Sequence, residues 1–283
     1  MLWRPLYPKE KECRLNTALC TWPHDHSHLY YTDGISETCT RTDASILQAR
    51  KDIDHQEKRN QIHFDEHQFI YRSSICKLSE QIQNAILVSP VPLPIRGRSG
   101  QLATSEIWRG LFLHDDRIFY TKMEEEQPSF SVDLVLDASA SCMDYQETLA
   151  AQSYVIAQSL QKCRIPVQVT SFSSLRSYTV IHRFIRYNET DKNTNLFRYF
   201  AAGWNRDGLA CVRSSIDGGR ACCPKPGLPI IFTDASPNDD RKIPASLEHG
   251  FALSRDYSGN AAVKDVATEV RALKKMASRS WPS

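Results

Sequence analysis

The stretch SVDLVLDASASCMDY (residues 131–145) decides the fold that we expect for this chain of 283 residues. It begins with an apolar run, DLVLD, which predicts a short buried β-strand. The run ends at Asp137, and two hydroxyl side chains, Ser139 and Ser141, follow at alternate positions. A turn with Ser141 or Asp144 as the N-cap of a helix would explain these residues. A metal site would explain them more specifically, because carboxylate and hydroxyl oxygens bind hard cations.

Strands and helices alternate from this stretch onward. Apolar runs predict further strands, and apolar residues at helical spacing predict the helices between them. The expected strands cover residues 167–173, 178–185 and 228–234, and the expected helices cover residues 145–162, 209–216 and 261–276. This alternation is typical of the α/β class, with a doubly wound, mostly parallel sheet. Ligands of such sheets bind at the carboxyl ends of the strands, near a switch in strand order.

Two segments precede the α/β domain, which we place at residues 129–283. Residues 1–40 show little periodicity and predict an irregular N-terminal segment. Residues 41–128 predict a helical extension followed by a linker. Apolar residues at helical spacing over residues 43–88 predict one long helix or two, and Pro90 prevents its continuation. The expected later parts are a linker at residues 90–100, a short helix at residues 105–113 and a solvated break at residues 124–128.

The composition narrows the class of protein. Apolar residues make up 41% of the chain, the net charge is only +2, and no basic stretch is interleaved with aromatic residues, so nucleic acid is not an expected partner. No apolar run approaches the roughly 18 residues of a membrane span, and the N-terminus lacks the apolar core of a signal peptide. We therefore expect a cytoplasmic protein. Nine cysteines, an odd number with no CxxC pair, indicate reduced thiols rather than a disulfide framework.

Two more loops carry oxygen ligands that could complete a metal site with Asp137, Ser139 and Ser141. The strand expected at residues 228–234 ends in Asp234, and GWNRDGLA (residues 203–210) offers Asn205 and Asp207 just before a helix. Carboxylates and hydroxyls without sulfur or imidazole suit Mg²⁺ first, with Mn²⁺ or Ca²⁺ as alternatives. We favour Asp207 over Asn205 as the middle ligand, because a carboxylate is the stronger ligand. Three neighbouring residues are expected to be solvated loop residues instead: Asn238, Asp239 and Asp240.

A second group of residues has the donor types of a Zn²⁺ site. It consists of Cys20, His24 and His28, with His26 between the two outer histidines and Cys39 as a distant fourth donor. No CxxC or HxxxH pattern supports the site. We therefore prefer surface histidines in an irregular segment and keep Zn²⁺ as the less favoured alternative.

The three oxygen-bearing loops together resemble a known family. DASAS, NRDGLA and TDASPND resemble the loops of a von Willebrand factor A domain with its metal-ion-dependent adhesion site. Residues 96–276 resemble more closely the bacterial nitric-oxide-reductase activation proteins of the NorD type, relatives of the CobT cobaltochelatase subunit. The phrases that carry this resemblance are RGRSGQL, WRGLFLHDDRIF and DYSGNAAVKDVATEVRALKK.

The resemblance implies a function and a set of ligands. Asp137, Ser139 and Ser141 match the first motif, and Asp234 matches the acid of the last, which acts through water in such domains. The implied function is that of a metal-dependent protein-binding module, not an enzyme. Its implied partners are a MoxR-type AAA+ ATPase and a client metalloenzyme such as nitric oxide reductase. The resemblance also implies a further strand and helix after residue 276, so we expect a truncated domain.

Two other functions remain open from the residues alone. The same acids could bind Mg²⁺ and a phosphate ester, with a strand-end aspartate as phosphoryl acceptor in a hydrolase. Alternatively, a truncated chain could be an inactive remnant, because a missing strand leaves an unpaired sheet edge.

Overall fold

The structure is a computed structural model. It describes residues 3–35, 44–88, 96–98, 101–102, 104, 107–113, 116–120, 130–187, 189–216, 227–248 and 250–280. The predicted break at residues 124–128 and three of the cysteines, Cys39, Cys222 and Cys223, lie outside these residues. The six cysteines within them are all free thiols.

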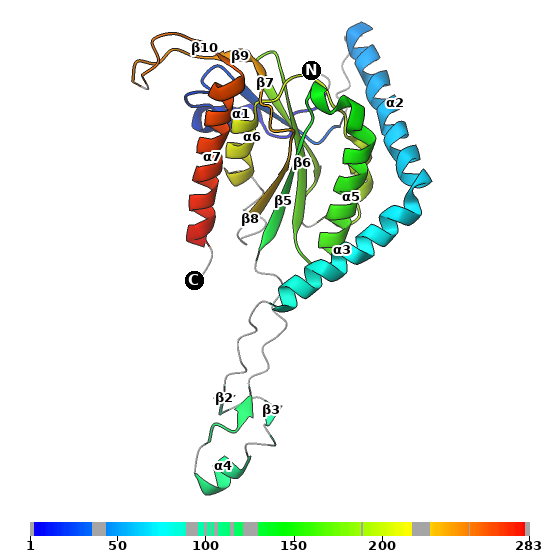
Figure 1. Cartoon of the computed structure of the whole chain (residues 1–283), viewed down its shortest axis with the longest axis vertical. Helices are drawn as coiled ribbons and strands as arrows, with labels where there is room; N and C mark the ends of the chain where they lie inside the picture. The colour runs from blue at the N-terminus through cyan, green and yellow to red at the C-terminus, as the bar shows by residue number, and fades with distance from the viewer. Residues whose placement is uncertain are drawn as a thin grey trace.

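A five-stranded sheet forms the centre of the molecule, in the order β1-β7-β6-β5-β8 (Figure 1). Its strands are β1 (His28–Thr32), β5 (Ser131–Asp137), β6 (Val167–Leu175), β7 (Tyr178–Ile185) and β8 (Gly227–Phe232). Neighbouring strands run parallel except for the hairpin of β6 and β7. The predicted α/β class with a mostly parallel sheet is therefore confirmed.

Helices cover both faces of the sheet (Figure 1). One face packs against α5 (Gln146–Lys162), and the extension formed by α2 (Ala44–Glu66) and α3 (Gln68–Val88) packs against α5 in turn. The other face lies toward α1 (Lys9–Leu19), α6 (Asp207–Ile216) and α7 (Gly259–Ser280). The alternation of side chains along β5 explains the two layers, since Leu134 and Leu136 enter one core and Val135 enters the other.

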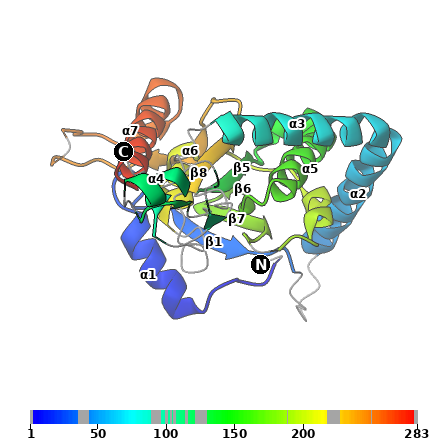
Figure 2. The same ribbon diagram turned by 90° about the horizontal axis from the view of Figure 1, so that it is seen from below.

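The extension consists of two helices, which settles the choice that the sequence left open. The helices α2 and α3 meet at a bend around α5 (Figures 1 and 2). Asn60 of α2 is buried, and its amide donates to the carbonyls of Phe197 and Tyr199 at 2.8 and 2.9 Å. A buried amide with two backbone partners fixes α2 against the loop that follows β7.

The N-terminal residues differ from the irregular segment that we expected for residues 1–40. They form α1 and then β1, which pairs with β7 at the edge of the central sheet. The strand is short, but Leu29, Tyr30 and Tyr31 are buried in it. The local signal was weak because Leu19 is the only buried residue of α1 and the partner of β1 lies far along the chain.

Two small elements complete the fold. A three-stranded sheet of β2 (Arg96–Gly97), β4 (Phe119–Tyr120) and β3 (Gln101–Leu102) accompanies α4 (Ile107–Phe112), apart from the central sheet in Figure 1. An antiparallel ribbon joins β9 (Asp239–Ile243) and β10 (Arg255–Tyr257). Among the described residues, no helix has the length and apolar character needed to cross a membrane.

Candidate metal centre

The three predicted loops lie together at the carboxyl ends of β5 and β8. β5 and β8 are parallel neighbours, so the loops that follow them start side by side. The backbone N–H of Ala140 donates to Gly203 O at 2.9 Å, and that of Ala202 donates to Ala138 O at 2.8 Å. These bonds hold the loop before α6 against the first loop. Two backbone hydrogen bonds attach the third loop: Asn205 N–H donates to Asn238 O at 2.9 Å, and Asn238 N–H donates to Asn205 O at 3.0 Å.

Asp137 is the centre of the hydrogen bonds among these loops. Its carboxylate is 1% exposed, and its Oδ1 accepts the backbone N–H of Ser139 at 2.8 Å. Its Oδ2 accepts from the Asn205 amide at 3.2 Å and from the Thr233 hydroxyl at 3.1 Å. The same hydroxyl lies 3.2 Å from Asp207 Oδ2. A hydroxyl has one proton, so it can donate to only one of the two carboxylates at a time.

Asp207 is a buried carboxylate whose pKa is strongly raised. Its side chain is 2% exposed, and its Oδ1 has no hydrogen-bond partner within the described residues. Burial, and then the charge of Asp137, raise the pKa of Asp207 to about 7. Burial also raises the pKa of Asp137. Two adjacent buried carboxylates with an unpartnered oxygen are costly on their own, and a cation between them would offset that cost.

The two serines of the first loop have no capping role. The short 3₁₀ helix η2 (Ala140–Tyr145) and α5 after it both lack a side-chain cap hydrogen bond. Instead, Ser139 Oγ and Ser141 Oγ lie 2.8 Å apart and bond to each other. The alternative of a turn capped by Ser141 or Asp144 therefore has no hydrogen bond to support it. The two neutral hydroxyl oxygens of the loop that follows Asp137, and the carboxylates of Asp137 and Asp207, are donor types that suit a hard cation.

Asp234 stands at the edge of this set. The strand β8 ends at Phe232, two residues earlier than predicted, so Asp234 lies in the exposed loop. Its Oδ1 accepts the backbone N–H of Ser236 at 2.9 Å. It is close enough for its charge to contribute to the raised pKa of Asp207. Within the described residues, no three His, Cys, Asp or Glu side chains gather closely enough to hold a metal ion, so a cation here needs the hydroxyls as well.

Sequence reasoning missed two residues of this region. Thr233 places a hydroxyl between the buried carboxylates of Asp137 and Asp207, although the sequence indicated it only as part of a strand end. Arg206 lies in the loop before α6 and is 1% exposed, and its Nη1 donates to Asp239 Oδ2 at 2.7 Å. The expectation that Asp239 is solvated is therefore wrong. No local signal identifies a buried arginine, because its partners come from distant parts of the chain.

The partners of Arg206 also account for the histidine-rich segment. Arg206 Nε donates to His24 Nδ1 at 2.9 Å, so the expectation of a surface histidine is wrong at His24. Burial and the positive charge of Arg206 lower the pKa of His24 to about 3. The other two candidate zinc donors have separate contacts: Cys20 Sγ lies 3.4 Å from Asn16 Oδ1, and the His28 ring lies 5.5 Å from the ring of Tyr178.

Glycine at position 208 allows the helix α7 to approach the loop. A Cβ atom on Gly208 would lie 2.0 Å from Asp265 Oδ2. The backbone N–H of Gly208 donates to the Tyr257 hydroxyl at 3.3 Å. Tyr257 in turn donates to Asp265 at 2.6 Å and lies over the Arg206 guanidinium. Asp207 is thus held between two residues that are themselves fixed by buried contacts.

The chain was also compared with known proteins. The comparisons with family models, with curated proteins and with solved structures give no match.

Proposed function

We propose that this chain is a metal-dependent protein-binding module, and that its metal centre binds Mg²⁺ and captures a carboxylate from a partner protein. The observation that carries the proposal is the pair of buried carboxylates, Asp137 and Asp207, with one shared hydroxyl from Thr233. The Oδ1 of Asp207, which has no hydrogen-bond partner in the described part of the chain, adds an oxygen that a cation would use.

Each residue has a role in this proposal. Asp137 and Asp207 supply the negative charge, Ser139 and Ser141 supply neutral oxygens, and Asp234 acts through water. Hydroxyl ligands leave more positive charge on the ion than carboxylates do, so an open coordination position would attract an external carboxylate. Mn²⁺ and Ca²⁺ are the alternative ions. Ser141 and Asp234 are exposed, so a partner can reach that side of the centre.

The identity of the partner is proposed from the sequence resemblance. It is a MoxR-type AAA+ ATPase, which would pass ATP-driven motion through the metal contact to a client metalloenzyme such as nitric oxide reductase. The module itself would be no enzyme. Burial raises the pKa of the neighbouring Cys142 thiol, which makes it a poor nucleophile at neutral pH.

The test is calorimetric titration of the full chain with Mg²⁺. Asp137→Ala and Asp207→Asn should each weaken Mg²⁺ binding strongly. Asp144→Asn serves as the matched control, because Asp144 is an exposed acid close by in sequence. Equal Mg²⁺ affinity in the wild type and in Asp137→Ala would contradict the proposed centre.

The partner is tested by a pull-down with a purified MoxR-type AAA+ ATPase, with and without EDTA. Retention that chelator abolishes supports the proposal. A phosphatase assay with generic substrates separates the other functions: turnover lost in Asp137→Asn would favour the hydrolase. A chain without cooperative unfolding would favour an inactive remnant.

A further inference from the structure

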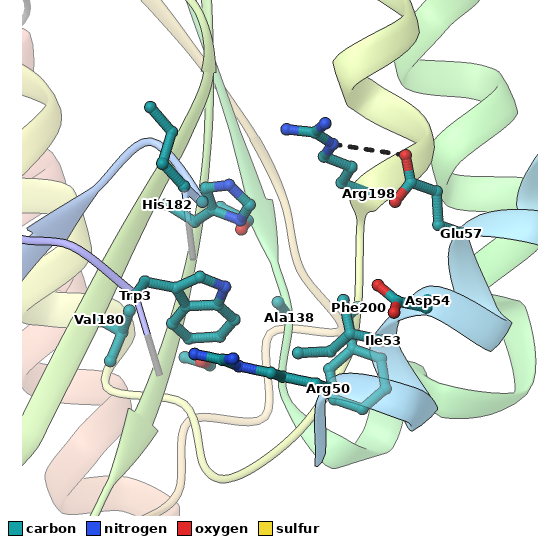
Figure 3. A pocket seen from close by; sticks show the side chains of 14 residues that line it. Trp3, Arg50, Ile53, Asp54, Glu57, Ala138, Val180, His182, Arg198 and Phe200 are labelled. Carbon is teal, nitrogen blue, oxygen red and sulfur yellow. Dashed lines mark hydrogen bonds and ion pairs between the residues drawn. The ribbon is translucent and has the colours of Figure 1, made fainter. Parts of the chain in front are cut away.

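A cavity of about 410 Å³ lies between α2 and the part of the sheet formed by β6 and β7 (Figure 3). It results from the small side chains of Ser171 and Ser173 on one face of β6. Two cross-strand pairs form its floor, Ser171 with His182 and Ser173 with Val180. Near the other end of the same face, Val167 and Val169 fill the space and contribute to the core. The volume falls in the range of small-molecule sites, which is about 300–1,000 Å³.

Aromatic rings form one wall of this cavity. The Trp3 ring stacks on His182, with centroids 6.0 Å apart and an interplanar angle of 28°. The chain at Trp3 is held in place, because the Tyr30 hydroxyl donates to Trp3 O at 2.6 Å. Gly34 makes room for the stack: it has a φ of +74°, and a Cβ there would lie 2.3 Å from His182 Nε2. Burial lowers the pKa of His182 to about 4, so this wall is uncharged at neutral pH.

Four charged side chains face the cavity, and their formal charges cancel. Arg50, Asp54 and Glu57 come from one side of α2, and Arg198 faces them from the end of η3 (Asn193–Arg198). Glu57 and Arg198 form an ion pair, with Oε1 and Nε 3.3 Å apart. Figure 3 draws this pair, and in the same view the side chains of Arg50 and Asp54 extend toward the cavity.

Arg50 and Asp54 are the groups that define the chemistry of a ligand. They are four residues apart on a helix, so their side chains are neighbours on one face. A guanidinium has five N–H donors, so Arg50 can hold other contacts and still donate to a ligand. A ligand with one negative and one positive group close together matches this pair. A polyanion would place negative charge beside Asp54 and Glu57, and a simple cation would lie beside Arg50.

We propose that this cavity binds an α-amino acid with an apolar side chain. Its carboxylate accepts hydrogen bonds from Arg50, and its ammonium group donates to Asp54. Its side chain lies against Trp3, Ile53 and Phe200, which Figure 3 shows around the same space. The site needs no metal ion, so it stands apart from the metal-dependent function proposed above.

The experiment is calorimetric titration of the full chain in EDTA with the apolar L-amino acids one by one, L-leucine and L-phenylalanine first. Phenethylamine and 3-phenylpropionate are the matched probes, because each lacks one of the two charges of phenylalanine. We expect an amino acid to bind and each single-charge analogue to bind about ten-fold or more weaker, the effect of one lost charged hydrogen bond.

Variants of the cavity make the test specific. Arg50→Gln and Asp54→Asn should each weaken amino-acid binding about ten-fold or more, since each removes one charged partner. Lys51→Gln and Asp65→Asn are the controls, because these exposed residues of α2 do not line the cavity and should leave binding unchanged. Ser173→Leu should abolish binding by filling the floor, with the melting temperature measured to show that the chain still folds. Absence of binding by every apolar amino acid, or equal binding of the three phenyl compounds, would overturn the proposal.

Discussion

The buried ion pair between Arg206 and Asp239 should couple the two side chains strongly in a double-mutant cycle. The atoms Nη1 and Oδ2 lie 2.7 Å apart, and the two side chains are 1% and 4% exposed. The perturbations are Arg206→Met, Asp239→Leu and the combination of both. Each single change leaves one charge buried without its counter-charge, whereas the double change removes both charges.

The expected magnitude follows from this burial. Removal of one partner of a buried ion pair costs about 3–5 kcal/mol of folding free energy. Arg206→Met also removes the bonds to His24 Nδ1 and Pro23 O, both at 2.9 Å, so its cost should lie at the upper end of that range. Burial raises the pKa of Asp239 even though Arg206 opposes the shift, so removal of both charges relieves a real desolvation cost. We therefore expect the double variant to be more stable than the sum of the single effects by at least about 2 kcal/mol.

The assay is urea unfolding, monitored by circular dichroism, for the wild type and the three variants. A matched control exists on the same ribbon of β9 and β10. Lys242 Nζ and Asp256 Oδ1 lie 3.1 Å apart, but the side chains are 63% and 73% exposed. The corresponding cycle of Lys242→Met and Asp256→Leu should give a coupling below about 1 kcal/mol. Additive effects at Arg206 and Asp239, or equal coupling in the two cycles, would refute the reasoning.

Three other environments lead to measurable expectations. The pKa of His24 is about 3 in the fold and near 6.5 in the unfolded chain, so acid protonates the unfolded state first and stability falls below about pH 6.5. His24→Gln should remove about 2 kcal/mol of the stability lost between pH 7 and pH 5, measured by urea unfolding, and an unchanged pH dependence would contradict this. Gly208→Ala should cost about 1–3 kcal/mol, since its Cβ would lie 2.0 Å from Asp265 Oδ2, and an unchanged melting temperature would exclude the contact. Asp207→Asn should raise the melting temperature of the metal-free protein at pH 8, because burial raises the pKa of Asp207 to about 7 and so penalises its charged form. The same substitution should end the stabilisation of the protein by Mg²⁺. A lower melting temperature of the metal-free variant would argue against this account.

The regions that the sequence predicted well are those with local signals. The apolar run at residues 178–185 predicted β7 with the bounds that the structure shows, and the helix after Tyr145 was predicted to within one residue. Asp137 and Asp234 could be placed near each other because parallel strands end at the same edge of a sheet. The sequence did not reveal how Thr233 lies between Asp137 and Asp207, since that depends on the exact ends of β5 and β8.

The features that escaped prediction depend on contacts between distant residues. The burial of Arg206 requires His24 from the N-terminal segment and Asp239 from β9, and no local pattern indicates such a group. β9 itself carries charged residues and lies partly exposed, so it lacks the apolar run of a core strand. The cavity beside α2 likewise arises from serines that look unremarkable in the sequence of β6.

The place of β1 in the sheet has a consequence for synthesis on the ribosome. His28 pairs with Tyr178, so β1 leaves the ribosome about 150 residues before its partner strand, which takes roughly 10–30 seconds at common translation rates. During that interval Leu29, Tyr30 and Tyr31, which are buried in the finished sheet, have no strand to cover them. The nascent chain therefore exposes an apolar segment that is prone to association until the hairpin of β6 and β7 has formed.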